Sequence, residues 1–440
     1  MTGRYKAYTE YKDSGVDWLH DIPTHWKSIP VGRCYRRVKR TGFENEELLS
    51  VYRDHGVVPK SSRDDNNNKP SDDLSPYQLV CESNLVMNKM KAWQGSIAIS
   101  EFRGIVSPAY FVYEPMSHID SLVYPKYVHY LLRHPIYITQ YMSRSKGIRV
   151  NQWDLDPEEF QRIELLLPQR EEQKSIISFL DHETAKIDTL ITKQEKLIEL
   201  LKEKRQAVIS HAVTKGLNPQ APMKDSGVEW LGEVPEHWVV SKFGYISQVV
   251  RGGSPRPAGD PTLFNGDYSP WVTVAEITKD DEIYLTETET FLTKKGSLQC
   301  RVFSSGTLLL SNSGATLGVP SILKIDANAN DGVVGFENLK INSEYAYFYL
   351  SSLTDGLRER IKQGSGQPNL NTDIVKDISI PLPPLDEVEQ VVAFIHKMRK
   401  HYSTLEKKAK EGISLLKERK TALISAAVTG KIDVRDWEVN

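Results

Sequence analysis

Two long stretches of the chain carry apolar residues at alternating steps of three and four, with charged residues between them. The first runs from Pro168 to Leu217 and the second from Pro383 to Ile432, and the two align without a gap at an offset of 215 positions. Both are rich in Leu, Ile, Lys, Glu and Ala and carry no proline past their first residues, as is typical of helices. The pattern therefore predicts two long helices of related sequence.

The apolar stripe on each predicted helix has a period close to 3.5, which is typical of coiled coils. A long helix cannot bury such a stripe against itself, so it either joins a larger bundle or pairs with its counterpart, and the repeat favours pairing. Gly412 should weaken the second helix by about 1 kcal/mol. Ile191, Ile198 and Ile413 lie beside the stripe and are candidates for contacts with partner proteins. The predicted helix-pairing residues are Leu180, Ile187, Leu190, Leu197, Leu201, Val208, Ile395, Tyr402, Leu405, Leu416 and Leu423.

A second repeat opens each half of the chain, and we call it the clasp. Lys12–Trp26 and Lys224–Trp238 agree at 10 of 15 positions, at an offset of 212. Its tryptophans are expected to form an apolar contact at the edge of each domain. His25 and His237 are either ligands or packed residues, and packing is favoured because the sequence offers no neighbouring Cys or carboxylate partner.

Between clasp and helix, the two halves differ. The first segment predicts strands at Glu47–Tyr52, Leu85–Met90, Ser96–Ser100 and Val106–Tyr113, and an exposed loop at Ser61–Asp73. The second predicts strands at Trp271–Val274, Thr307–Ser311 and Val319–Ile325. An aromatic helix recurs late in each segment, at Tyr127–Leu132 and Tyr345–Leu350. The frame is thus duplicated while the interiors have diverged.

This order of elements predicts an α+β chain with an internal pseudo-two-fold duplication. Because the linker Asn218–Met223 is short, the second helix must start near the end of the first and run back along it, as an antiparallel coiled coil. The predicted parts are a first globular domain at 1–167, a helix at 168–217, a second globular domain at 218–382, and a helix with a tail at 383–440.

Composition narrows the class of protein. The chain has 440 residues, a formal net charge of −2 and three cysteines at wide spacing, which exclude a disulfide framework and a cysteine zinc cluster. No signal peptide or membrane-length apolar stretch is apparent, so a cytoplasmic protein is expected. The chain shows no Walker A loop, no G-x-G-x-x-G, no H-E-x-x-H, no G-x-S-x-G and no Asn/Asp-Pro-Pro-aromatic motif of amino-methyltransferases. A non-enzymatic role without cofactor or metal is therefore predicted.

Basic and polar residues cluster locally in both diverged segments, in patterns that suit phosphate contacts and base-edge readout. Ordinary solvated charge is the alternative for each cluster taken alone, but clusters in both halves favour DNA. The predicted DNA-binding residues are Arg36, Arg37, Lys39, Arg40, Arg53, Lys60, Lys89, Lys91, Arg144, Lys146, Arg149, Arg251, Ser254, Arg256, Lys294, Lys295, Asn312, Lys362 and Gln367.

These features together resemble the specificity subunits of type I restriction–modification systems. The resemblance covers nearly the whole chain and rests on the duplicated W-L-x-x-[IV]-P-x-H-W clasp, the Leu-Pro before each helix, and the repeated helix ending in S-x-A-V-T. Asn88–Gly95 with Gly104–Tyr110, and Leu309–Gly318, are similar to two groups of target-recognition domains in this family. The family's Glu-Gln after Leu-Pro is kept at Glu172-Gln173 and changes to Glu387-Val388 in the second copy.

The resemblance implies two target-recognition domains, each reading one half of a bipartite, asymmetric site on double-stranded DNA, held apart by the paired helices. It also implies a non-catalytic subunit of an endonuclease and adenine-N6 DNA methyltransferase complex that serves in phage defence. Two methylation and two restriction subunits would be its partners, and these would bring S-adenosylmethionine, ATP and Mg²⁺. Two rival hypotheses remain: a two-headed coiled-coil scaffold that binds proteins, and a self-contained DNA-modifying enzyme.

Overall fold

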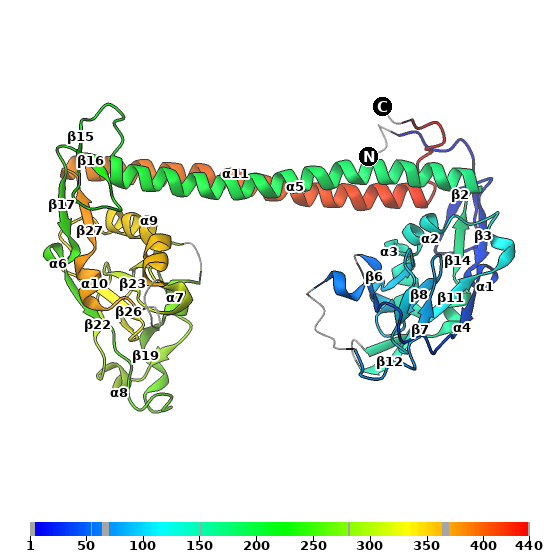
Figure 1. The fold of residues 1–440 in the computed structure, drawn as a ribbon, viewed down its shortest axis with the longest axis horizontal. Helices are drawn as coiled ribbons and strands as arrows, with labels where there is room; N and C mark the ends of the chain where they lie inside the picture. Colours follow the sequence, from blue (N-terminus) through cyan, green and yellow to red (C-terminus); the bar gives the residue numbers. More distant parts are fainter. Residues whose placement is uncertain are drawn as a thin grey trace. The chain divides into compact units, whose positions relative to one another are not determined.

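The computed structural model describes residues 5–53, 55–63, 70–149, 152–279, 282–362 and 369–438. By its internal contacts the chain divides into two compact units, which we describe one at a time (Figure 1). Unit 1 comprises residues 1–194 and 411–440, and unit 2 comprises residues 195–410. Each long helix, α5 (Arg170–Lys215) and α11 (Leu385–Val428), therefore contributes one part to each unit.

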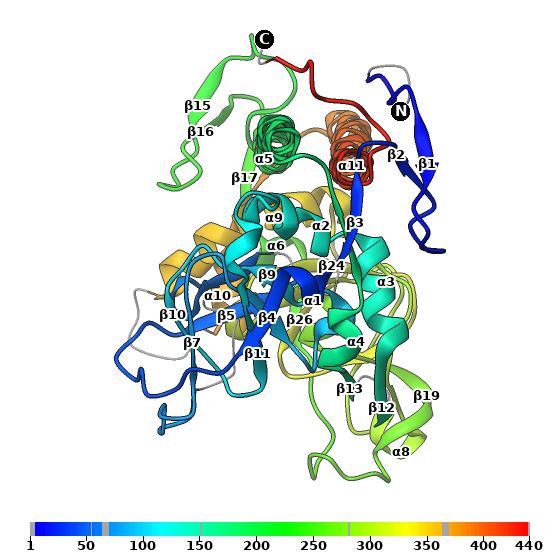
Figure 2. The ribbon, with the colours of Figure 1, turned by 90° about the vertical axis from the view of Figure 1, so that its right-hand side faces the viewer.

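In unit 1 the first part of α5 packs against the last part of α11. Near the start of α5, the ring of Phe179 lies 5.2 to 5.4 Å from the rings of Tyr5 and Trp437, the latter beyond the end of α11. Further along, the Lys420 ammonium group donates to the Asp188 carboxylate at 2.7 Å. Residue numbers thus rise on α5 as they fall on α11, so the two helices are antiparallel. Figure 2 looks along them and shows them side by side.

Unit 2 repeats this arrangement with the roles of the helices exchanged. Arg205 on α5 lies 3.9 Å from the Glu406 carboxylate on α11, and the end of α5 at Gly216 meets the start of α11 at Glu387. Apolar residues of both helices, Ile209 and Ile395 among them, join one core. The predicted α+β fold with an antiparallel pair of long helices is confirmed.

The structure corrects two positions of the predicted stripe. Leu190 and Leu197 are 46% and 42% exposed, so they lie outside it. Ile191 and Ile198, predicted to lie beside the stripe, are half-buried within it, and Ile191 packs against the core of unit 1. Steps of three and four residues can be counted from either member of an adjacent Leu-Ile pair. The sequence alone therefore does not decide which of the two residues faces the partner helix. Between Thr184 and Val208, the buried and half-buried positions of α5 are Thr184, Ile187, Ile191, Gln194, Ile198, Leu201, Arg205 and Val208.

On α11 all five predicted stripe residues are covered. Ile395 and Leu423 are buried, and Tyr402, Leu405 and Leu416 are half-buried.

Unit 1 is built on a four-stranded antiparallel sheet in the order β4-β11-β8-β9. Two-stranded ladders β5-β6 and β10-β7 pack beside it around a small second core. The strands are β4 (Tyr35–Val38), β5 (Leu49–Tyr52), β6 (Gly56–Pro59), β7 (Gln78–Val80), β8 (Leu85–Asn88), β9 (Ile97–Ile99), β10 (Gly104–Val106) and β11 (Tyr110–Pro115). Helices α2 (Pro125–Leu132) and α3 (Pro135–Arg144), hairpin β12-β13 (Ser145–Arg149, Gln152–Leu155) and α4 (Pro157–Gln161) follow.

Unit 2 carries different sheets. One has five strands in the order β18-β26-β23-β24-β20, and the other has four in the order β21-β19-β25-β22. The strands are β18 (Gln248–Arg251), β19 (Phe264–Val272), β20 (Tyr284–Leu285), β21 (Phe291–Leu292), β22 (Val302–Phe303), β23 (Leu308–Ser311), β24 (Pro320–Leu323), β25 (Ala327–Ala329) and β26 (Val333–Glu337). The helices are α7 (Val274–Ile277), α8 (Lys294–Ser297), α9 (Ser343–Lys362) and α10 (Thr372–Asp377).

A common frame surrounds these different sheets. Each clasp forms a short hairpin, β1-β2 (Tyr11–Asp13, Asp21–Pro23) or β15-β16 (Met223–Asp225, Glu233–Pro235). The strand after each clasp pairs with the strand before the long helix, as β3-β14 (Lys27–Pro30, Glu164–Leu167) and β17-β27 (Val239–Lys242, Ser379–Leu382). One-turn helices follow at α1 (Val31–Cys34) and α6 (Phe243–Ile246). The duplicated frame and diverged interiors thus appear as predicted.

The limits of some strands differ from those predicted. Val106–Tyr113 is two strands, because Pro108 lies between β10 and β11 and has no N–H for a ladder. Trp271–Val274 is the end of the nine-residue β19 followed by α7. Residues 64–69 of the predicted loop Ser61–Asp73 lie outside the described residues.

Candidate nucleic-acid interface

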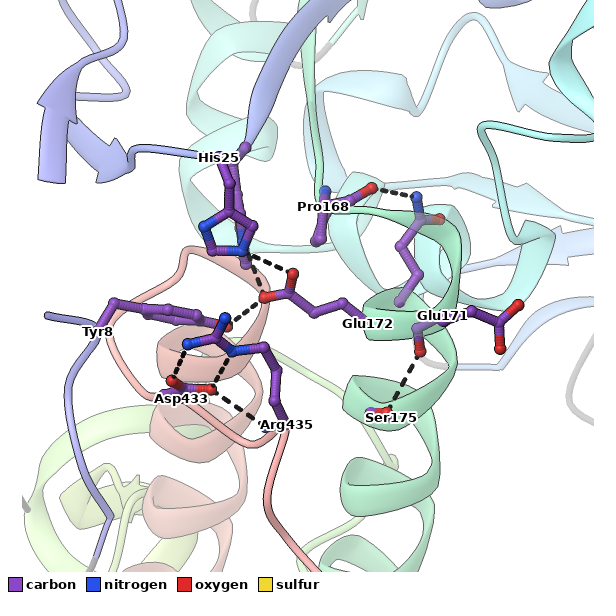
Figure 3. A network of polar contacts seen from close by, with 10 residues as sticks. Tyr8, His25, Pro168, Glu171, Glu172, Ser175, Asp433 and Arg435 are labelled. Atoms are coloured by element: carbon purple, nitrogen blue, oxygen red, sulfur yellow. Dashed lines mark hydrogen bonds and ion pairs between the residues drawn. The ribbon is translucent and has the colours of Figure 1, made fainter. Parts of the chain in front are cut away.

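Each clasp contacts a glutamate in the first turn of a long helix. In unit 1 the Glu172 carboxylate accepts hydrogen bonds from the Tyr8 hydroxyl at 2.7 Å and from Trp26 Nε1 at 3.0 Å, and lies 2.7 Å from His25 Nε2. Figure 3 shows Tyr8 and His25 converging on this carboxylate, with Arg435 beside them. Trp26 is fully buried. The carboxylate therefore joins the clasp to the first turn of α5.

Unit 2 repeats this contact with fewer partners. Glu387 accepts from Trp238 Nε1 at 3.0 Å and lies 2.8 Å from His237 Nε2. The expectation that the two histidines lack carboxylate partners was wrong, because the helix start that supplies the glutamate is about 150 residues away in sequence. The signal was present, since Glu172 and Glu387 occupy equivalent positions in the repeat.

The change from Gln173 to Val388 has a local explanation. The Gln173 side chain accepts from Tyr124 N at 2.8 Å and donates to Leu122 O at 2.7 Å, which fixes the start of α2. In unit 2 the corresponding start of α9 is capped by Asn342, whose side chain accepts from the backbone N–H of Tyr345 at 3.1 Å. Val388 is buried instead. The second unit thus replaces a long-range amide contact with a local helix cap.

In each unit, an equivalent tyrosine attaches the globular part to the C-terminal end of a long helix, α11 in unit 1 and α5 in unit 2. The Tyr127 hydroxyl of α2 donates to the Val428 carbonyl at the end of α11, at 3.3 Å. The Tyr345 hydroxyl of α9 donates to the Val213 carbonyl near the end of α5, at 3.0 Å. Burial raises the pKa of both hydroxyls well above their usual range. Both tyrosine hydroxyls therefore stay protonated and act as donors to the ends of the long helices.

The predicted basic cluster at the start of unit 1 is partly neutralised. Arg36 on β4 and Arg40, two residues after its end, lie 2.5 and 3.7 Å from the Glu114 carboxylate of the neighbouring strand β11. The Arg37 guanidinium lies 3.9 Å above the Phe111 ring. Lys39 is exposed. Two of the four residues lie on β4 and two follow it, and acidic or aromatic partners hold three of them.

A groove of about 410 Å³ gathers other predicted residues of unit 1. Lys60, after β6, and Lys91, after β8, both line it, together with Asn88 at the end of β8. Tyr52, Tyr77 and Tyr110 supply aromatic walls, and Ser107 a hydroxyl. Cationic, amide and aromatic groups around one groove are the combination that binds nucleic-acid backbone and bases.

The remaining predicted residues of unit 1 lie apart from this groove. Lys89 Nζ is 3.2 Å from Asp154 on β13, near the Trp93–Trp153 ring pair. Arg144 Nη1 is 3.4 Å from Glu159, and Lys146 is exposed on β12. Arg53 lines a different pocket with His129 and Lys420. The structure therefore does not bring all the predicted cations of unit 1 to one surface.

In unit 2 the predicted residues Arg251, Ser254 and Arg256 lie on one anchored loop. Arg251 Nε donates to the Asp331 carbonyl and the Ser254 hydroxyl donates to the Asp331 carboxylate, both at 2.7 Å. The Ser254 hydrogen bond is the main cause that lowers the pKa of Asp331. Asp331, which holds this loop, was missed because a lone aspartate in a turn carries no sequence signature.

The prediction that Asn312 contacts DNA is wrong. Its side chain is fully buried and its Nδ2 donates to the Asp331 carbonyl at 3.2 Å, so it supports the same turn and cannot reach a base edge. Lys294 and Lys295 begin α8, where Lys294 Nζ lies 6.0 Å from the centre of the Tyr268 ring.

Three predicted residues are described partly or not at all. The backbone of Arg149 ends β12 and that of Lys362 ends α9, whereas Gln367 lies outside the described residues. Among the described residues no group of three or more His, Cys, Asp or Glu side chains is arranged to hold a metal ion. Within the same ranges, no helix has both the length and the apolar character needed to span a membrane.

Known proteins resemble this chain in sequence. Residues 235–415 match the family described as the type I restriction modification DNA specificity domain. The MjaVIII specificity subunit of Methanocaldococcus jannaschii is 24% identical over 97% of this chain and 98% of its own length. The EcoKI specificity subunit of Escherichia coli K12 is 21% identical over 93% and 90%. The MjaIX specificity subunit is 30% identical, but over only 41% of this chain and 44% of its own length.

Solved structures share the fold. A chain from a type I R-M system, described for its complex assembly and conformational transition, superposes with a TM-score of 0.67 at 16% identity, covering 93% of this chain and 99% of that one. The HsdS subunit of Thermoanaerobacter tengcongensis superposes with a TM-score of 0.53 at 16% identity, covering 93% and 98%.

Proposed function

We propose that this chain is a specificity subunit of a type I restriction–modification system, which recognises DNA for such a complex and performs no catalysis itself. Each unit reads one half of a bipartite, asymmetric site on double-stranded DNA. The observation that carries the proposal is that the attachment of the globular parts to the long helices is duplicated. Equivalent glutamates and tyrosines fix each globular part to both long helices, whereas the sheets of the two globular parts differ.

The proposed mechanism separates positioning from reading. Lysines and arginines at the groove of unit 1 and on the loop of unit 2 contact phosphates, which sets register without sequence information. Amide and guanidinium groups of the same surfaces contact base edges in the major groove. Because the two surfaces are built from different strands, the two half-sites differ in sequence.

The paired helices set the distance between the half-sites and provide the surface for partner proteins. In this proposal two methylation subunits dock on the chain and two restriction subunits join the full complex. Those subunits hold S-adenosylmethionine, ATP and Mg²⁺, and this chain holds none of them. Exposed apolar residues on the helices, Leu190, Leu197 and Leu415, are available for such docking, because they are 42 to 64% exposed.

The test is an electrophoretic shift assay on the chain with and without its methylation subunits, over a salt series. Mapping of methylated bases in DNA exposed to the same complex then gives the target. We expect binding that weakens with salt and a target of two unlike half-sites. Salt-independent binding or no binding to DNA by the complex would favour the protein scaffold. Methyl transfer by the isolated chain would instead establish a self-contained enzyme.

Replacing Arg36, Arg37, Lys39 and Arg40 together by alanine tests the first basic cluster. We expect weaker binding to all sequences and a flatter salt dependence, since phosphate contacts are lost. Arg162→Ala is the matched control, because Arg162 is an exposed arginine of the same unit paired with Glu159 at 2.8 Å. An unchanged salt slope in the fourfold variant would show that Glu114 and Phe111 keep this cluster for the sheet alone.

A further inference from the structure

The segment Arg251–Arg256 of unit 2, which we call the recognition loop, is tied to one turn of the protein. Gly252 N donates to Val333 O and Gly253 N to Ala329 O, both at 2.9 Å. The contacts of Arg251 and Ser254 with Asp331 complete the attachment to the turn between β25 and β26. Four successive residues held by two backbone and two side-chain hydrogen bonds lose little further entropy when the loop binds a ligand.

Close packing at Gly252 reinforces the attachment. A Cβ at this position would lie 2.2 Å from the Asn330 carbonyl oxygen and 2.5 Å from that of Ala329. Any other side chain would therefore push the recognition loop away from the turn. In contrast, a Cβ at Gly253 would meet nothing within 4 Å. The two neighbouring glycines thus provide a disruptive position and a matched control.

At the end of the loop, Arg256 combines a fixed backbone with an available side chain. Its N–H donates to Gln299 Oε1 at 3.0 Å, and Pro255 before it is buried. The Arg256 side chain is exposed, and within the described residues its guanidinium forms no hydrogen bond or ion pair. Arg251 differs, because its Nε is already engaged by the Asp331 carbonyl.

An exposed arginine on a rigid loop has a specific recognition chemistry. The planar guanidinium presents two parallel N–H groups, which match the O6 and N7 acceptors of guanine in the major groove. No other base presents that pair of acceptors, and a lysine ammonium group does not reproduce the planar fork. A phosphate also accepts from arginine, but equally well at every sequence.

We infer that Arg256 reads a guanine in the half-site recognised by unit 2. The inference rests on the proposed function, since it requires that this unit contact DNA. Within that function it names the residue, the base and the two acceptor atoms. The turn residues position the loop, and the guanidinium makes the base contact.

The experiment measures base preference with the complex reconstituted with its methylation subunits. The probe is a DNA library in which both half-sites are randomised, and methylated bases are mapped. Gly252→Ala identifies the half-site of unit 2, because displacement of the loop should relax selectivity there and nowhere else. Gly253→Ala should leave both half-sites unchanged. Thermal unfolding of each variant complex confirms that it folds.

Arg256→Lys is the decisive variant. We expect the preference for guanine at one position of the unit 2 half-site to fall about tenfold or more, with the other half-site unchanged. Arg301→Ala, at another exposed arginine of unit 2, which pairs with Glu337 at 3.0 Å, should change neither half-site.

Two results would overturn the inference. One is uniformly weaker binding by Arg256→Lys or Arg256→Ala with base preferences intact, which would make Arg256 a phosphate contact. The other is a unit 2 half-site without a guanine position that responds to Arg256. Failure of the proposed function looks different, because the wild-type complex would then show no bipartite target at all.

Discussion

Removal of Glu172 should destabilise unit 1 more than removal of Glu387 destabilises unit 2. Glu172→Ala leaves Tyr8 OH and Trp26 Nε1 without their acceptor, and both side chains are buried, with 5% and 0% exposure. Each unsatisfied buried donor costs roughly 1–3 kcal/mol, so the total is on the order of 2–6 kcal/mol. This is a large fraction of the roughly 5–15 kcal/mol that stabilises a typical domain.

Glu387→Ala provides the matched comparison within the same chain. Here Trp238 Nε1 is the buried donor that loses its acceptor, and the Glu387 side chain is 21% exposed where that of Glu172 is 6% exposed. Water can therefore replace part of the lost contact. We expect a cost of about 1–3 kcal/mol, smaller than that of Glu172→Ala.

A double-mutant cycle isolates the tyrosine contribution. Tyr8→Phe removes the donor, so that Glu172→Ala in that background leaves one fewer unsatisfied group. The cost of Glu172→Ala should then fall by about 1 kcal/mol or more.

The assay is urea unfolding of the chain followed by tryptophan fluorescence, with hydrogen exchange to assign the loss to unit 1 or unit 2. Equal costs for the two glutamates, or a larger cost for Glu387→Ala, would refute the assignment of Glu172 as the stronger anchor of its clasp. If the costs of Glu172→Ala and Tyr8→Phe simply added in the double variant, the role assigned to Tyr8 would be refuted.

Three further predictions concern the long helices and α3. Gly412→Ala should raise the free energy of unfolding by about 1 kcal/mol, since a Cβ there meets nothing within 4 Å. Gly430→Ala should lower it, because φ at Gly430 is +72° and the Cβ would lie 2.5 Å from Pro23. Thermal unfolding of both variants checks the contrast. Burial lowers the pKa of His134 to about 4, so the folded state binds fewer protons than the unfolded state between pH 6.5 and 4, and stability should fall as pH drops through that window. The neutral His134 ring accepts from Ile136 N as the cap of α3, so His134→Asn should keep the cap and flatten the pH dependence of urea unfolding. Matched four-residue insertions after Leu197 and after Gly412 should lengthen the DNA spacer by one or two base pairs, at about 1.5 Å per residue against 3.4 Å per base pair, and an unchanged spacer in the mapped target would exclude the helices as the ruler.

Sequence periodicity predicted the long helices because the repeat supplied two copies of one pattern, and the short linker Asn218–Met223 predicted their antiparallel direction. It misplaced Leu190 and Leu197, since two adjacent apolar residues fit the stripe equally well and only the partner helix decides between them. The contact of Glu172 with His25 was not predicted because it joins residues 147 positions apart.

Charge clusters were a weaker guide to the candidate interface. Arg36 and Arg40 stand close together in sequence, but the register of β4 on β11 puts Glu114 beside them. Asn312 was predicted to bind DNA, but its side chain is fully buried and donates to the Asp331 carbonyl. Cross-strand neighbours and burial depend on pairing that no local pattern specifies.

The division of each long helix between the units has a consequence for synthesis. Unit 2 is one continuous stretch, residues 195–410, and all of it has been translated when residue 410 is joined. Unit 1 needs residues 411–438 to cover α5, and these are made only after the whole of unit 2. The part of the chain made first is therefore completed last. Until then, the apolar face of α5 near Leu180 lacks its α11 partner and is open to chaperones and to aggregation.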